Sequence, residues 1–116
     1  MEIVETSLSG VPLLRVIGDI DHFTSLALDD AVQDALAQHS SHLLLDLSEC
    51  FYLDSGGLGV ILTTLRKLRT KGWLGVIGCR ADLLRLFTIS GLTAEPEFRV
   101  FASPDEVSAA GAKVET

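Results

Sequence analysis

Few residues in this sequence are grouped in a way that supports catalysis or metal binding. The three histidines, His22, His39 and His42, fall in different predicted elements, whereas metal ligands normally converge with a defined spacing. The sequence also has no nucleophile elbow, no Walker phosphate loop, no zinc-protease motif and no Cys-x-x-Cys pair. We therefore predict a protein without a metal site or cofactor, which acts by binding and not as an enzyme.

Two cysteines are the remaining residues with redox chemistry. Cys50 and Cys79 each come just after a predicted strand. Consecutive strands joined by one crossover often lie side by side, so the two thiols could approach each other and form a regulatory pair. Two cysteines cannot make a disulfide scaffold, and we expect both thiols to be reduced in the resting protein.

Two polar, glycine-containing loops are the candidate binding site. Residues 18–24 (GDIDHFT) and 53–60 (LDSGGLGV) both lie where a predicted strand ends and a helix begins. That end of a parallel sheet usually carries the working surface of an α/β protein. Asp54 or Ser55 can cap the second helix, and the glycines allow tight turns. The candidate contact residues are Asp21, His22, Thr24, Asp54, Ser55, Gly56 and Gly57.

The elements that must position these loops alternate between strand-like and helix-like segments. The alternation predicts an α/β fold that begins with a hairpin and continues in βα repeats. Right-handed crossovers then give a mainly parallel sheet, with helices mostly on one face. The predicted strands are 2–8, 11–17, 43–48, 73–78 and 98–101; the predicted helices are 24–38, with Thr24 as N-cap, 57–70, 82–90 and a closing helix of about eight residues after a capping box at 103–106.

Composition and charge limit the classes of function. The chain has 116 residues, 47% of them hydrophobic and 22% charged, which predicts one globular domain over residues 1–116. It has no apolar run long enough for a membrane span, and Glu2 and Glu5 disfavour a secretory signal, so we expect a cytoplasmic protein. Residues 1–58 hold ten acids and one base, whereas residues 59–116 hold eight bases and six acids. This acidic balance argues against nucleic-acid binding and suits a basic protein partner.

Residues 43–60 (LLLDLSECFYLDSGGLGV) resemble the signature of STAS-domain anti-sigma-factor antagonists. That family shows an apolar strand, Asp-Leu-Ser, a short apolar stretch and then Asp-Ser-Ser-Gly-Leu-Gly at the start of a helix. Residues 18–21 (GDID) followed by Thr24 resemble its Gly-x-Leu-Asp…Thr element, and residues 90–92 (SGL) resemble the end of its third helix. The resemblance covers nearly the whole chain in the right order.

The resemblance implies a switch protein that binds an anti-sigma factor and so frees a sigma factor. In the family, the anti-sigma factor is often a serine kinase with a histidine-kinase-like ATPase fold. The kinase phosphorylates the second serine of the motif, which blocks binding. Alignment on Asp54 places Ser55 on the first serine and Gly56 on the phosphorylated one. The usual acceptor is therefore absent, which leaves Ser55 as a displaced acceptor, Thr24 or another hydroxyl as a substitute, or a constitutive binder, the outcome we favour.

Other functions fit the same fold. The chain could be a STAS subunit of a membrane transport complex, such as a lipid ABC transporter, and dock to its ATPase. It could also be a scaffold subunit of a larger signalling assembly, whereas a nucleotide-binding or enzymatic role is a more distant alternative. Under the main interpretation, Asp21→Asn and Asp54→Asn should weaken partner binding and leave the melting temperature unchanged.

Overall fold

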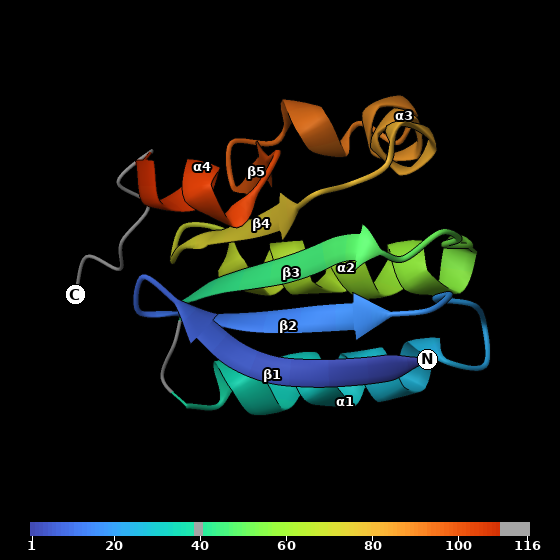
Figure 1. The fold of residues 1–116 in the computed structure, drawn as a ribbon, viewed down its shortest axis with the longest axis horizontal. Coiled ribbons are helices and arrows are strands. Elements are labelled where there is room, and N and C mark those ends of the chain that lie inside the picture. The colour runs from blue at the N-terminus through green and yellow to red at the C-terminus, as the bar shows by residue number, and fades with distance from the viewer. Residues whose placement is uncertain (39–40, 110–116) are drawn as a thin grey trace.

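The computed structural model describes residues 1–38 and 41–109 and contains one five-stranded sheet with the strand order β1-β2-β3-β4-β5 (Figure 1). β1 and β2 form an antiparallel hairpin, and every later pair is parallel. The predicted α/β class is therefore confirmed. The elements are β1 (Glu2–Leu8), β2 (Val11–Ile17), α1 (Ser25–Leu36), β3 (His42–Glu49), α2 (Ser55–Leu68), β4 (Trp73–Ile77), α3 (Ala81–Ile89), the 3-10 turn η1 (Leu92–Ala94), β5 (Phe98–Phe101) and α4 (Pro104–Ala109).

The hairpin forms around Ser9 and Gly10, as predicted. Both residues have positive φ, 54° for Ser9 and 80° for Gly10. A two-residue loop with positive φ at both positions matches the right-handed twist of the strands that it joins. Leu8 and Val11 are therefore paired directly on either side of the turn.

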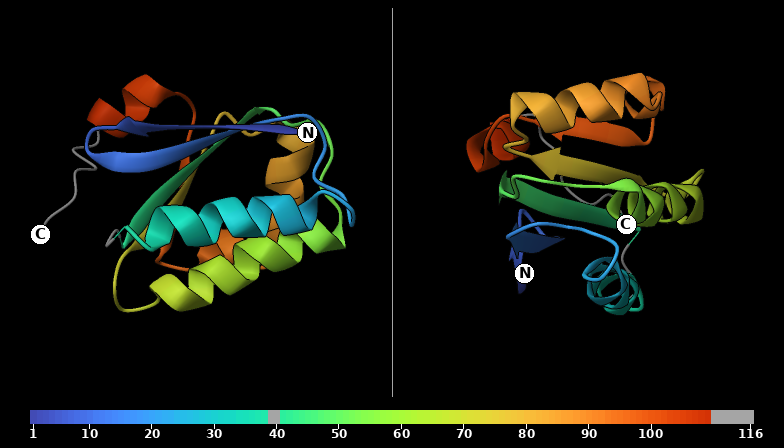
Figure 2. Two further views of the ribbon diagram at one scale, coloured as in Figure 1. Left: turned by 90° about the horizontal axis from the view of Figure 1, so that it is seen from below. Right: turned by 90° about the vertical axis from the view of Figure 1, so that its right-hand side faces the viewer.

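Three helices cover one face of the sheet, and α4 covers only one end of the other face (Figure 2). Alternate residues of each strand point to opposite faces, so each strand contributes to both apolar layers. The main core lies under α1, α2 and α3 and includes Leu14, Val16, Leu28, Leu43, Leu45, Ile61, Leu65, Val76 and Phe87. The second core, under α4, contains Val11, Leu13, Leu44, Trp73, Ile77, Phe101 and Val107.

Some predicted element boundaries differ from those in the structure. α2 begins at Ser55, two residues before the predicted start, because the Asp54 side chain caps it. Thr24 precedes α1 but makes no side-chain cap bond to that helix. Half of the predicted capping box before α4 is present: the Glu106 N–H donates to Ser103 Oγ at 3.3 Å, whereas Glu106 Oε1 accepts the N–H of Ala102, one residue before the N-cap Ser103. The predicted end of this helix lies beyond the described residues.

Within residues 1–38 and 41–109, no helix combines the length and apolar character that a membrane crossing requires.

Candidate functional site

Backbone hydrogen bonds hold the two candidate loops side by side beyond the ends of β2 and β3. The Ile20 N–H donates to the Tyr52 carbonyl at 2.9 Å, and the Asp54 N–H donates to the Ile20 carbonyl at 3.1 Å. Ile20 and Leu53 thereby form an isolated parallel bridge. Both side chains are buried, so the bridge is anchored to the main core. The sequence places the loops at one sheet edge, and the structure joins them.

The Asp54 carboxylate links the same two loops through its side chain. Oδ1 accepts the N–H of Gly56 at 2.8 Å and that of Gly57 at 3.4 Å, which caps α2. Oδ2 accepts the N–H of His22 at 3.0 Å. A carboxylate that accepts N–H groups from both loops fixes their relative position, so Asp54 is the central residue of the site.

Asp21 and Thr24 close the first loop on itself. Asp21 Oδ1 accepts the N–H groups of Phe23 and Thr24, each at 2.9 Å. The Thr24 hydroxyl accepts the Asp21 N–H at 2.8 Å and donates to the Asp19 carbonyl at 3.0 Å. The backbone N–H of Thr24 stabilises the carboxylate and thereby lowers the pKa of Asp21 below its ordinary value. Thr24 therefore has its hydroxyl turned into the loop.

Position 56 is enclosed by both loops. A Cβ built on Gly56 would lie 3.2 Å from Asp54 Oδ1, from the His22 Cα and from Ser25 Oγ. Ser25 is buried and its hydroxyl donates to the His22 carbonyl at 3.1 Å. The residue at the family's acceptor position therefore has little free space around its Cα.

The two residues on either side of Gly56 differ sharply in exposure. Ser55 is exposed at the start of α2, and its side chain makes no hydrogen bond within the part of the chain that the structure describes. Gly57 is buried instead, and a Cβ there would lie 2.6 Å from Ile20 Cγ2 and 2.9 Å from Leu53 Cγ. Gly57 therefore allows α2 to approach the first loop from inside the protein, and the expectation that it contacts a partner directly does not fit its position.

Cys50 and Cys79 are both free thiols in the structure. Cys50 is buried and donates to the Tyr52 carbonyl at 3.4 Å, and Cys79 packs against the same core. Burial raises the pKa of the Cys50 thiol, and burial with the nearby Cys50 raises that of Cys79 to about 12. Thiols of this kind form little thiolate at neutral pH, which makes them slow nucleophiles.

Exposed apolar side chains around the loops were not identified from the sequence. Phe23 is 86% exposed just before α1, and Leu26 is 72% exposed in its first turn, while Phe51 is 55% and Tyr52 51% exposed between β3 and the second loop. The Arg80 guanidinium lies 4.8 Å from the Phe51 ring centroid. Exposed aromatic residues of this size are typical anchors of protein interfaces. Leu26 is an apolar residue outside the buried face of α1, which Leu28, Val32 and Ala35 form. This is the signal by which the sequence could have identified it as exposed.

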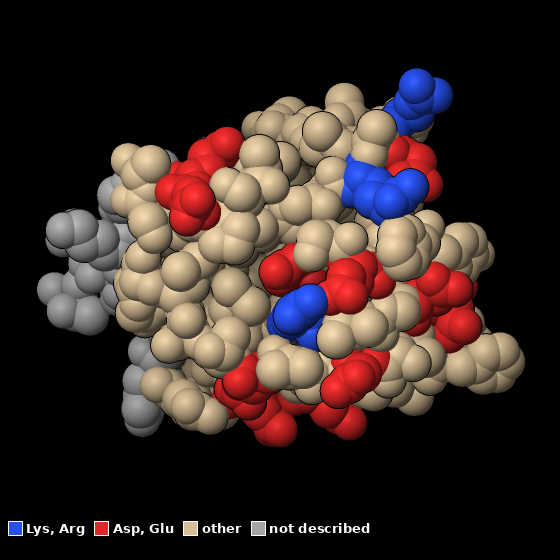
Figure 3. Space-filling view, in the orientation of Figure 1, with Lys and Arg blue, Asp and Glu red and all other residues tan. Residues whose placement is uncertain are grey.

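The charge around the loops is acidic. Asp19, Asp21 and Asp54 come from the two loops, and none of them forms an ion pair with a described residue. Acidic side chains also gather over β1, β2 and β3 on the face in Figure 3, where few basic ones appear. The surface therefore combines apolar side chains with a negative rim.

Comparisons with known proteins by sequence and by structure find the same kind of relative for this chain. The family model described as "Mlab, STAS domain" matches residues 4–99. An anti-sigma F factor antagonist of Paenibacillus polymyxa is 34% identical over 88 residues, which cover 72% of this chain and 73% of the relative. The anti-sigma-F factor antagonist RsfB of Mycobacterium tuberculosis is 30% identical over 95 residues, or 82% of this chain and 76% of the relative. The crystal structure of an anti-sigma factor antagonist from Mycobacterium paratuberculosis, 28% identical, superposes with a TM-score of 0.82 and covers 94% of this chain and 92% of that chain.

A family model that spans most of the chain makes this protein a STAS domain. The chain belongs to the anti-sigma factor antagonist family of STAS domains, to which both curated relatives and the solved structure also belong by name. The predicted resemblance is therefore confirmed.

Proposed function

We propose that this chain is an anti-sigma-factor antagonist, which binds an anti-sigma factor and so releases a sigma factor for transcription. It acts by partner switching in the cytoplasm and catalyses no reaction. The names of the relatives support this function. The observation that carries the proposal for the site is the Asp54 carboxylate, which accepts N–H groups from both loops beneath an exposed surface.

The contact surface consists of exposed side chains of the two loops. Phe23 and Tyr52 supply apolar area, and Asp21, His22 and Ser55 supply polar groups from the two loops. Apolar anchors inside a charged rim are the usual anatomy of a specific interface. The partner therefore offers an apolar pocket with basic side chains around it. The resemblance points to an anti-sigma factor that is a serine kinase of the histidine-kinase-like ATPase fold.

The same surface works without a phosphorylation switch. Gly56 has no hydroxyl at the family's acceptor position, and its Cα is enclosed by the two loops. Ser55 is exposed but one residue away, which turns its side chain by about 100° around the helix. The protein is therefore a constitutive binder, whose control lies in its amount or in the choice of partner.

Co-purification tests the function. The tagged chain is isolated from its native host, and the proteins bound to it are identified by mass spectrometry. Recovery of an anti-sigma factor supports the proposal. Recovery of a transporter ATPase would instead support the lipid-transport alternative, and recovery of a large signalling assembly would support the scaffold alternative.

Binding measurements with the purified anti-sigma factor test the surface. Phe23→Ala removes the most exposed apolar side chain of the site and should weaken binding by about tenfold or more, as truncation of an interface anchor usually does. Val4→Ala is the control, because Val4 is an exposed apolar residue of β1 that pairs with Arg15 and belongs to neither loop. Equal affinities for both variants would place the interface elsewhere.

A further inference from the structure

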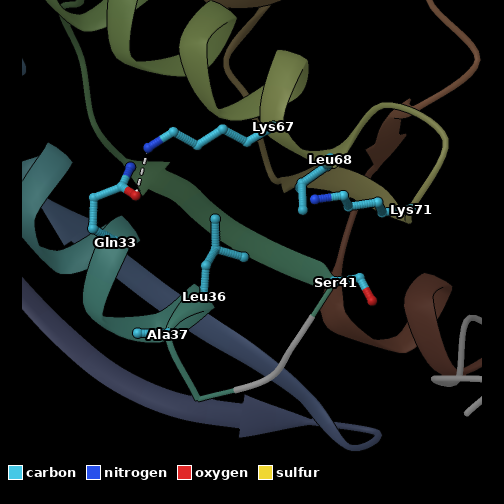
Figure 4. Close-up of a pocket in the computed structure, with 7 residues that line it drawn as sticks. All are labelled: Gln33, Leu36, Ala37, Ser41, Lys67, Leu68 and Lys71. Atoms are coloured by element: carbon cyan, nitrogen blue, oxygen red, sulfur yellow. Dashed lines mark hydrogen bonds between the residues drawn. The ribbon is translucent and has the colours of Figure 1, made fainter.

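A cavity lies at the end of the α1–α2 pair that is remote from the candidate site. Its volume is about 390 Å³, and Figure 4 shows its lining residues. They come from the last turns of α1 and α2, from Lys71 just after α2 and from Ser41 just before β3. Cavities of this volume are at the lower end of the range that holds small ligands. The cavity is not part of the surface described above.

The lining has an apolar part and a basic part. Leu36, Ala37 and Leu68 supply the apolar surface, and Leu68 is only 3% exposed. Lys67 and Lys71 supply two ammonium groups. Neither ammonium forms an ion pair with a carboxylate in residues 1–38 or 41–109. Two uncompensated positive charges beside an apolar wall are complementary to an anion with an apolar body.

The Lys67 side chain makes its hydrogen bond to a different helix. Lysines near a helix C-terminus commonly compensate the helix dipole. Lys67 Nζ instead donates to Gln33 Oε1 at 2.6 Å, across the gap between α2 and α1 (Figure 4). Gln33 Nε2 donates in turn to Asp29 Oδ1 at 3.3 Å, which fixes the orientation of the amide. The Lys67 ammonium is therefore held beside Gln33 in the cavity lining, with two further protons left to donate.

We propose that this cavity binds a small amphipathic carboxylate, such as a medium-chain fatty acid. The carboxylate accepts hydrogen bonds from the Lys67 and Lys71 ammonium groups, and the apolar chain lies against Leu36 and Leu68. The ligand would contact α1 and α2, the same helices whose first residues belong to the candidate site. The proposal does not depend on the anti-sigma function, because the two sites share no residue.

Titration with octanoate, followed by amide NMR shifts, tests the site directly. Octanoate should cause saturable shifts confined to the ends of α1 and α2. The double variant Lys67→Gln/Lys71→Gln should bind at least about tenfold more weakly, since a hydrogen bond to a charged group contributes about a factor of ten in affinity. Arg66→Gln/Arg69→Gln is the matched control: it removes the same charge from the same helix end but leaves the cavity lining intact.

The other probes separate the two parts of the lining. Octanol should bind more weakly than octanoate, because it lacks the charge, and inorganic phosphate should bind more weakly because it lacks the apolar chain. Equal binding of octanol, equal binding of phosphate, or equal loss in the lysine and arginine variants would each overturn the proposal. Shifts that spread over the whole protein without saturation would also overturn it, since they indicate nonspecific adsorption.

Discussion

At the scale of single residues, Asp54 has one role that the sequence suggested, the helix cap, and one that it did not, the hydrogen bond to the other loop. Its carboxylate caps α2 and also accepts the His22 N–H, so both oxygens are used.

Asp54→Asn replaces one oxygen by an N–H₂ group, which cannot accept a hydrogen bond. We expect the free energy of unfolding to fall by about 1 kcal/mol, because the amide can still cap α2 but can no longer also accept the His22 N–H. This differs from the unchanged melting temperature expected from the sequence. The variant should also bind its partner more weakly. Urea unfolding and calorimetry measure the two effects, and Asp30→Asn, exposed within α1, should change neither. A variant with full stability would mean that the hydrogen bond from the His22 N–H to the second oxygen contributes nothing, since asparagine can still cap α2 through its one oxygen.

Phosphate transfer depends on the residue at position 56. We expect the cognate kinase and ATP to leave Ser55 unmodified, because its side chain is displaced by about 100° from that of the next helical residue. Gly56→Ser should accept phosphate, provided that Ser25 and His22 shift by a few tenths of an ångström to admit the new Cβ. Mass spectrometry locates the phosphate, and Gly56→Ala is the control for the added bulk. Stoichiometric phosphate on Ser55 of the unaltered protein would contradict the constitutive binder.

His42 makes stability depend on pH. Its Nδ1 accepts the backbone N–H of Trp73 at 3.2 Å, which requires the neutral imidazole. The imidazole also stacks on the Trp73 indole. Burial, together with the charge of Arg99, lowers the pKa of His42 in the folded protein. The unfolded chain therefore binds the proton more readily, so this stability is complete above the ordinary pKa of about 6.5 and is lost as the pH falls below it. Urea midpoints between about pH 5 and 8 should show the decline, and His42→Gln should flatten it. A decline that persists in this variant would assign it to another group.

At the scale of elements, two glycines of α2 should respond in opposite ways to the same substitution. A Cβ at Gly57 would lie 2.6 Å from Ile20 Cγ2, whereas a Cβ at Gly59 would have no atom within 4 Å apart from its neighbours in the same helix. Gly57→Ala should therefore destabilise the protein by about 1–3 kcal/mol, because α2 must move away from the first loop. Gly59→Ala should stabilise it by about 0.5–1 kcal/mol through helix propensity. Denaturant unfolding compares the two variants, and a stable Gly57→Ala would show that the helix does not press against Ile20.

The same helix shows what the sequence could predict. Its buried residues Ile61, Leu65 and Leu68 follow the 3.6-residue period of an amphipathic helix, and so the helix could be predicted. Its first residue was not predicted, because the sequence left the cap open between Asp54 and Ser55, and the Asp54 side chain makes the cap, so that the helix starts at Ser55. The candidate loops were placed correctly because strand ends of a parallel sheet converge. The exposure of Phe23 and the burial of Gly57 depend on contacts between distant segments, which periodicity does not encode.

At the scale of the whole molecule, the acidic charge should guide the approach of the partner. The chain carries a net charge of −7, and Asp19, Asp21 and Asp54 bring part of it to the candidate site. An acidic surface attracts a basic one over about a Debye length, which is about 10 Å at 0.1 M salt. The association rate with the anti-sigma factor should therefore fall on the order of tenfold between about 50 mM and 500 mM NaCl. Stopped-flow measurements give this rate directly.

Variants distinguish this long-range attraction from the contacts of the bound state. Asp19→Asn should slow association and reduce its salt dependence, because Asp19 is exposed and its carboxylate forms no ion pair with a described residue. Phe23→Ala should instead speed dissociation, since its ring acts only once the surfaces touch. Asp105→Asn in α4 changes the net charge equally, but α4 meets the hairpin turn through Ser108 and Ser9, at the opposite end of β2 from the first loop, so both rates should stay unchanged. If Asp105→Asn slowed association as much as Asp19→Asn, the attraction would come from the net charge of the chain and not from the acidic rim of the loops.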